Sequence, residues 1–173
     1  MFLLYLFSMK TIDRRAAVKK LKSLIFTQKS EPIPFREKIE KEYSTLFLPN
    51  GVELSETRIG KVDCDLLIPE VSAKNRVMIY VYGGSFVGGT RSSWRSFCAS
   101  LAHASSTETY VPELHRSPEH PFPAALEDVV EVLKILSSLK NEIVLMADSA
   151  GASLAVGAIL SLPKLIRTKI KEV

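Results

Sequence analysis

The stretch that decides the fold runs from residue 143 to residue 151 and reads IVLMADSAG. Its first five residues are apolar, as expected for a strand that is buried on both faces. Ser149 follows in a sharp turn, and mostly small and apolar residues then continue as a helix from Ala150 to about residue 160. A serine between a buried strand and a helix is the nucleophile-elbow pattern. The alternative is an inert turn serine, and the strand–turn–helix context favours the nucleophile.

This geometry explains why the neighbours of Ser149 are small. A strained turn pushes the serine Oγ above the edge of the sheet, so the residues two places before and two places after it must be small. Gly151 meets this requirement, and Ala147 stands where the usual pattern has glycine. The N–H group of Ala150 lies at the start of the helix, where it would point at an oxyanion forming on a bound carbonyl group.

A second strand and loop lie upstream. Residues 77–82, VMIYVY, form a continuous apolar run that stops at Gly83-Gly84. Two consecutive glycines bend the backbone and expose their N–H groups, so they suit either an oxyanion loop or a turn that needs positive φ. Given Ser149 on a later strand, the oxyanion loop is favoured. We therefore expect residues 77–82 and 143–147 to be neighbouring parallel strands.

The rest of the chain alternates between strands and helices. Further strands are expected at residues 51–60, 62–68 and 107–111, and helices at residues 10–27, 34–44, 92–103 and from Pro123 through Leu136. Gly60-Lys61 is a tight turn, which predicts an antiparallel edge pair for the first two strands. The sequence thus predicts an α/β fold, with a mostly parallel sheet covered by helices on both faces and preceded by a helical N-terminal segment.

The composition is that of an ordinary globular domain. The 173 residues carry a net charge of +4, and the excess lies mainly near the two ends. No binding motif or aromatic interleaving accompanies it, so a solvated helix face is favoured over nucleic-acid or membrane contact. Cys64 and Cys98 lack metal-ligand spacing and are expected to be reduced thiols in a cytoplasmic protein. The apolar run at residues 1–9 is too short to span a bilayer, and translation beginning at Met9 would remove it.

A third segment identifies a family. Residues 117–128 read SPEHPFPAALED. In order along the chain, YGGS at residues 82–85, this segment, and ADSAG at residues 147–151 resemble the hormone-sensitive-lipase-like branch of the α/β-hydrolases. Members of that branch carry HGGG, a PEHPFPAALED-like stretch and GDSAGG. The resemblance covers roughly residues 50–162.

The resemblance implies a function and a set of site residues. The family hydrolyses carboxylic esters through an acyl-serine intermediate, without a cofactor or a metal. Ser149 would be the nucleophile, and the amides of Gly83, Gly84 and Ala150 the oxyanion donors. Residues 1–49 would form a helical cap segment, and residues 50–173 the N-terminal portion of an α/β-hydrolase domain. The expected partner is a small-molecule ester substrate or acyl ligand, with neither nucleic acid nor stable membrane insertion, and the oligomeric state is left open.

Several positions depart from the family pattern. Tyr82 stands where the family has histidine, and Ser85 where it has the third glycine. The usual tyrosine-arginine pair is Leu114-His115, and we expect its structural hydrogen bonds to be lost.

The largest departure concerns the catalytic triad, whose chain order in this fold is serine, acid, histidine. After Ser149 the sequence holds one acid, Glu172, and no histidine. Histidines occur only before the serine, at His103, His115 and His120, and we expect none within hydrogen-bond reach of Ser149. We also expect the strand before Ser149 to present an open apolar edge.

Three interpretations follow from this absence. The first is a serine esterase represented by a truncated chain, with little activity expected from these residues alone. The second is a hydrolase-fold protein without activity that binds an acyl ligand or a partner protein. The third is a basic peripheral protein that uses its terminal lysines on anionic surfaces.

Overall fold

A computed structural model describes residues 14–43 and 47–172, except for the side chains at positions 14, 17, 20 and 21. The apolar run at residues 1–9, the first four residues of the helix predicted at 10–27, and residue 44 lie outside the described residues. The helices are α1 (Arg14–Ser23), α2 (Pro32–Tyr43), α3 (Arg91–Ser105), α4 (Ala124–Leu139), α5 (Ser149–Ser161) and α6 (Lys164–Arg167). The strands are β1 (Val52–Ile59), β2 (Val62–Pro69), β3 (Arg76–Val81), β4 (Glu108–Pro112), β5 (Glu142–Ala147) and β6 (Ile170–Glu172).

The six strands form one mixed sheet in the order β1-β2-β4-β3-β5-β6. β3 lies between β4 and β5 and is parallel to both. At one edge, β1 and β2 are antiparallel and are joined by the two residues Gly60 and Lys61. This arrangement confirms the predicted α/β fold with an antiparallel edge pair.

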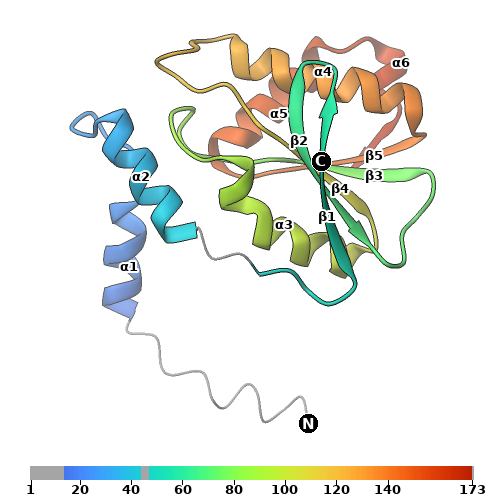
Figure 1. Cartoon of the computed structure of the whole chain (residues 1–173). Helices are drawn as coiled ribbons and strands as arrows, with labels where there is room; N and C mark the ends of the chain where they lie inside the picture. The colour runs from blue at the N-terminus through green and yellow to red at the C-terminus, as the bar shows by residue number, and fades with distance from the viewer. Residues whose placement is uncertain (1–13, 44–46, 173) are drawn as a thin grey trace.

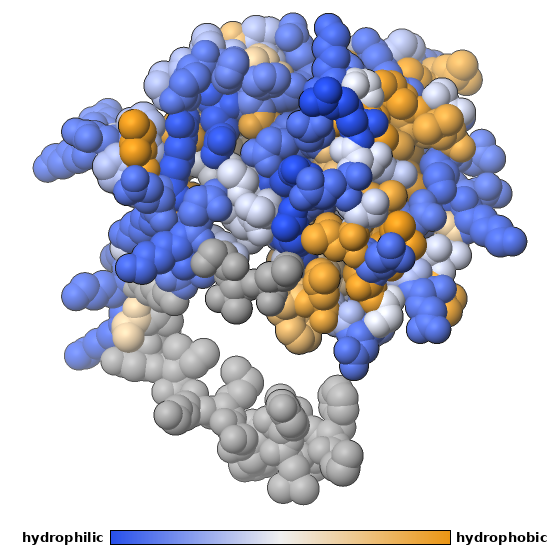
Figure 2. All heavy atoms as spheres, viewed as in Figure 1, coloured by the Kyte–Doolittle hydropathy of each residue, from blue (hydrophilic) through white to orange (hydrophobic). Residues whose placement is uncertain are grey.

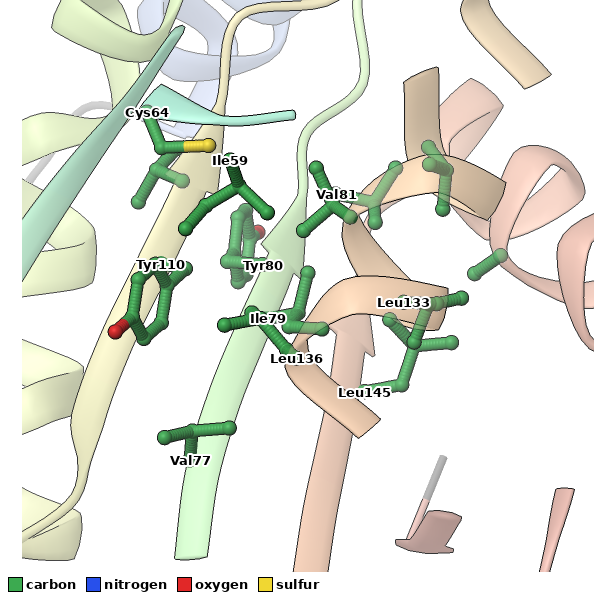
Figure 3. Close-up of a cluster of buried hydrophobic side chains, with 14 of the residues drawn as sticks. Ile59, Cys64, Val77, Ile79, Tyr80, Val81, Tyr110, Leu133, Leu136 and Leu145 are labelled. Atoms are coloured by element: carbon green, nitrogen blue, oxygen red, sulfur yellow. The ribbon is translucent and has the colours of Figure 1, made fainter. Parts of the chain in front are cut away.

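The centre of the sheet is buried because helices cover both of its faces (Figure 1). α3 packs against β2 and β4, whereas α4 and α5 pack against each other and over β1 to β5. The aromatic rings of Tyr80 and Tyr82 contact α3. Ile79 and Val81 alternate with these tyrosines along the chain and therefore face the other side of the sheet. The close-up of the core draws them with Leu133 of α4 (Figure 3). Burial on both faces explains why β3 reads as a continuous apolar run.

The register of β3 and β5 brings the two predicted functional segments together. Val81 pairs with Ala147, the last residue of each strand. Because parallel strands end at the same edge of a sheet, the loop after β3 and the turn after β5 emerge side by side. The prediction that these strands are parallel neighbours is confirmed.

The prediction of an open edge at β5 is wrong, because the last described residues cover part of that edge. The one-turn helix α6 reverses the chain after α5, and β6 then pairs in parallel with the first half of β5. Ile143 N–H donates to Lys169 O at 2.8 Å. The segment was missed because it is short and rich in lysine, so it has no apolar alternation to indicate a strand.

The helices α1 and α2 lie beside the main body (Figure 1). α2 begins at Pro32, inside the predicted break, because the first turn of a helix needs no N–H donors and therefore tolerates proline. Figure 2 shows mostly hydrophilic residues on the outer surface of both helices, in keeping with a solvated face. Every helix that the structure describes is too short or too polar to cross a bilayer.

Candidate active site

Ser149 occupies a strained position at the start of α5. Its φ is +50°, in the left-handed region, which costs a residue other than glycine roughly 1–2 kcal/mol. Asp148 before it is extended, so the chain turns sharply from strand to helix at the serine. The Ser149 side chain is exposed at the sheet edge. The local structure is therefore the strand–turn–helix geometry that the sequence predicts.

Close packing explains one of the two small residues around Ser149. A methyl group added to Gly151 would lie 2.1 Å from Val81 O and 2.6 Å from Tyr82 O. The first turn of α5 therefore lies directly against the end of β3. Ala147, in contrast, pairs with Val81 in the sheet and its side chain is accommodated. The pattern requires glycine after the serine here, but tolerates alanine before it.

The glycine loop, residues 83–89, folds tightly beside the serine. Gly84 O accepts hydrogen bonds from Val87 N–H at 3.0 Å and from Gly88 N–H at 2.8 Å. The φ of Gly84 is +131°, and a methyl group there would lie 2.0 Å from Gly88 O. A methyl group on Gly83 would lie 2.9 Å from Ser149 Cβ. Loop and serine are therefore in direct proximity, as an oxyanion site requires.

The backbone donors near Ser149 differ in whether they already have an acceptor. Gly83 N–H donates to Asp148 Oδ1 at 2.9 Å. The N–H groups of Gly84 and Ala150 donate to no acceptor within the described residues. The structure thus gives the Gly83 amide a partner other than the oxyanion that the sequence predicted, and leaves Gly84 and Ala150 without one.

Sequence reasoning missed the link between Tyr80 and Asp148. Tyr80 is buried in β3, and its hydroxyl donates to Asp148 Oδ1 at 3.0 Å. Burial and the negative charge of Asp148 raise the pKa of Tyr80, so its hydroxyl keeps its proton and remains a donor. Together with Gly83 N–H, it holds the carboxylate of Asp148 next to Ser149. A tyrosine three residues before the glycine loop and an aspartate before the serine were the available signals.

Tyr82 stabilises the start of the glycine loop in place of the family's histidine. Its hydroxyl accepts from Leu114 N–H at 2.9 Å, and its ring stacks on Trp94 with centroids 5.3 Å apart. Burial raises the pKa of Tyr82 well above the usual value for tyrosine. A neutral, hydrogen-bonded tyrosine therefore connects β3 to the segment after β4.

The expected loss of hydrogen bonds at Leu114-His115 is wrong. Besides the Leu114–Tyr82 bond, His115 N–H donates to Asp128 Oδ2 at 2.7 Å. His115 Nδ1 lies 2.9 Å from both carboxylate oxygens of Asp128. His115 is hydrogen-bonded because α4 brings the carboxylate of Asp128 against this segment.

In the described part of the chain, no hydrogen bond joins a histidine to Ser149, as expected from chain order. The rings of His115 and His120 contact each other, with centroids 4.4 Å apart. His103 is exposed on α3. Within residues 14–43 and 47–172, no cluster of histidine, cysteine or carboxylate side chains has the arrangement of a metal site.

An apolar hollow lies beside the start of α5. Its volume is about 210 Å³, and Phe86, Phe122, Leu126 and Leu154 contribute apolar walls. Phe86 belongs to the glycine loop and Leu154 to α5, so the hollow is lined by both segments that carry the candidate oxyanion donors.

Comparisons with known proteins agree on one fold. A family profile described as an alpha/beta hydrolase fold matches residues 78–171. An acetyl-hydrolase of Streptomyces hygroscopicus is 30% identical over 129 residues, and the match covers 73% of this chain and 42% of that protein. A probable carboxylesterase 6 of Arabidopsis thaliana is 30% identical over 150 residues, with 73% and 45% covered.

Solved structures show the same likeness. An esterase from the bacterial hormone-sensitive lipase family superposes with a TM-score of 0.75 at 22% identity, covering 86% of this chain and 51% of that one. A hormone-sensitive lipase from a metagenome library gives a TM-score of 0.73 at 24% identity, with 85% and 52% covered. At these identities the likeness is one of fold. The chain spans about two fifths of the length of the curated relatives and about half of the solved structures.

Proposed function

Because the chain belongs to the α/β-hydrolase fold family and has a fold of the hormone-sensitive-lipase type, we propose that it hydrolyses carboxylic esters. Ser149 is the nucleophile in this proposal. The observation that carries this proposal is the exposed serine at φ +50°, beside the amides of Gly84 and Ala150 that have no acceptor in the described residues. The names of the relatives, an acetyl-hydrolase and a carboxylesterase among them, support the same reaction class.

The proposed chemistry begins with attack of Ser149 Oγ on the ester carbonyl carbon. The carbonyl oxygen becomes an oxyanion and accepts from the N–H groups of Gly84 and Ala150, where the start of α5 adds positive potential. Collapse of this intermediate breaks the bond to the alcohol and leaves an acyl-serine. Water then attacks the acyl carbon and releases the acid. Gly83 N–H does not bind the oxyanion in this proposal. It holds the carboxylate of Asp148 instead.

Solvent water is the acceptor of the serine proton at this exposed position, and this limits the expected rate. Within the described residues, no imidazole is bonded to Ser149 Oγ. A serine without a neighbouring base keeps its ordinary weak nucleophilicity, and a triad that has lost its base retains only the contribution of the oxyanion site and of binding. We therefore propose that acylation of Ser149 in these 173 residues is slow.

The apolar hollow supports a small ester as the substrate. At about 210 Å³, the hollow is smaller than the roughly 300 Å³ at which pockets for drug-sized ligands begin. An acyl chain from acetyl to butyryl is small enough to enter it.

The test is acylation of Ser149 by p-nitrophenyl acetate. We expect intact-mass spectrometry of the 173-residue chain to show one added acetyl group on Ser149, with turnover well below about 1 per second. Ser149→Ala should remove the acetyl group, because it deletes the proposed nucleophilic hydroxyl. Circular dichroism and the thermal unfolding curve of both proteins establish that each is folded.

His115→Asn provides a matched control. Asparagine keeps a donor near the position of Nδ1 for Asp128 but cannot act as a base at neutral pH. We expect it to leave acetylation of Ser149 unchanged. A loss comparable to that of Ser149→Ala would identify His115 as the base, and acetylation that persists in Ser149→Ala would rule out Ser149 as the nucleophile. A folded chain that binds butyrate but never acylates would favour the acyl-binding alternative.

A further inference from the structure

The helix α2 packs directly on the glycine loop. Phe35 and Ile39 are buried, and they form a small apolar cluster with Val87. A methyl group on Gly88 would lie 2.7 Å from the Phe35 ring and 3.2 Å from Ile39 Cδ1. Helix α2 is therefore in close contact with the loop that carries Gly84, one of the proposed oxyanion donors.

Arg36 of α2 bridges the glycine loop and the segment that follows β4. Its Nε donates to Val87 O at 2.7 Å, and one terminal nitrogen donates to Ser117 O at 2.8 Å. The other terminal nitrogen donates to Glu119 Oε1 at 2.9 Å. The Arg36 side chain is only 18% exposed, so these bonds form largely away from solvent.

The two segments that Arg36 joins are also bonded to each other. Ser117 N–H donates to Phe86 O at 2.9 Å. Arg36 thus completes a small closed arrangement in which two backbone carbonyls, Val87 O and Ser117 O, accept from a single rigid guanidinium group.

The glycine loop needs such support because its backbone is strained. Ser85 and Phe86 both have positive φ, +57° and +62°, and neither is glycine. Left-handed φ values cost such residues roughly 1–2 kcal/mol each and persist only where the surroundings hold them. Both residues lie between Gly84 and Val87, and the carbonyl oxygen of Val87 accepts from Arg36. A loop freed at Val87 would relax toward negative φ and move the Gly84 amide.

We propose that Arg36 is a positioning residue that holds the glycine loop in its oxyanion-binding conformation through Val87 O and Ser117 O. It couples the N-terminal helical segment to the candidate active site without touching the substrate. The hydrogen bonds of Arg36 to Val87 O and Ser117 O are enough to support its role in holding the loop. Its consequence for acylation rests on the proposed function.

The test is amide hydrogen exchange of the glycine loop in the full chain. Arg36→Met should speed exchange of Gly83, Val87 and Gly88 by about tenfold or more, because the bonds from a charged donor to both carbonyls are lost. Exchange in β3 and β5 should stay unchanged. Arg36→Lys, which keeps the charge but can reach fewer acceptors, should give an intermediate effect and serves as the folded variant should Arg36→Met misfold.

Two further variants separate this role from an ordinary ion pair. Glu119→Gln leaves both carbonyl contacts in place, and because Glu119 is half exposed it should change loop exchange less than about fivefold. Arg58→Met removes an exposed arginine at the β1–β2 hairpin and should change nothing in the loop. An equal effect of Glu119→Gln and Arg36→Met, faster exchange throughout the core, or no change with Arg36→Met would each overturn the proposal.

The same variants also test whether the conformation of the glycine loop affects the rate of Ser149 acetylation. Acetylation of Ser149 at saturating p-nitrophenyl acetate should slow in Arg36→Met and recover in part in Arg36→Lys, while half-saturation occurs at an unchanged ester concentration. Absence of acetylation in the unmodified chain would contradict the proposed function but leave the exchange result to decide the role of Arg36. Normal acetylation with a mobile loop would show that the loop's conformation does not matter to the reaction.

Discussion

Gly151→Ala is expected to lower the free energy of unfolding by about 3 kcal/mol or more, equivalent to roughly 6–12 °C in Tm. The added methyl group would lie 2.1 Å from Val81 O, which is backbone in a central strand and cannot move aside as a flexible side chain could. Helix α5 must therefore separate from β3, and Ser149 moves with it. Thermal unfolding followed by circular dichroism measures the change.

Gly157→Ala is the matched control, with the same substitution two turns further along α5. The nearest atom to its new methyl group is Leu126 Cδ1 at 3.3 Å, the end of a flexible side chain. Alanine is the better helix former, so we expect Gly157→Ala to raise the free energy of unfolding by about 0.5–1 kcal/mol. A neutral Gly151→Ala, or equal destabilisation by both variants, would contradict the packing of α5 on β3.

Asp65→Ala is expected to destabilise the protein by about 3 kcal/mol, because two largely buried arginines lose their fully buried carboxylate and keep only the longer and more exposed pairs with Glu56 and Glu113. Asp65 is fully buried in β2. Arg91 donates to Asp65 Oδ1 at 2.7 Å, and Arg95 Nε donates to Asp65 Oδ2 at 2.6 Å. Both arginines project from α3, so this network attaches the helix to the antiparallel edge of the sheet. Chemical denaturation at two salt concentrations measures the loss and should show that it depends little on salt.

The control for this variant is Asp63→Ala in the same strand. Asp63 pairs with Arg58, and both side chains are more than half exposed. Solvent screens such a pair, so we expect stability close to that of the unmodified chain. If Asp63→Ala proved as destabilising as Asp65→Ala, burial would not be the reason for the difference.

The central strands and the turn that carries Ser149 could be located from the sequence alone. Residues 77–82 and 143–147 are apolar runs that stop at glycine or at a turn, and both are strands in the structure. Such runs are recognisable because a strand buried on both faces leaves a continuous local signal. Ser149 followed from the same signal, since its position between strand and helix is a property of neighbouring residues.

The tertiary structure alone decided how polar groups are paired. Nothing near Arg36 in the sequence indicates that it donates to Val87 O, 51 residues away. The partner of Gly83 N–H, Asp148, lies 65 residues away, and the sequence assigned that amide to the oxyanion instead. The strand β6 likewise depends on pairing with β5.

The physical reason for this division lies in the range of the interactions. Secondary structure reflects side-chain periodicity over a few residues, so a strand or an elbow serine can be recognised from a short window. A hydrogen-bond partner depends on which segments meet after the chain packs, and a buried donor takes whichever acceptor packing places nearby. The sequence therefore placed Ser149 at a turn between strand and helix, but only the packing of α2, β3 and β5 determined which groups contact the loop beside it.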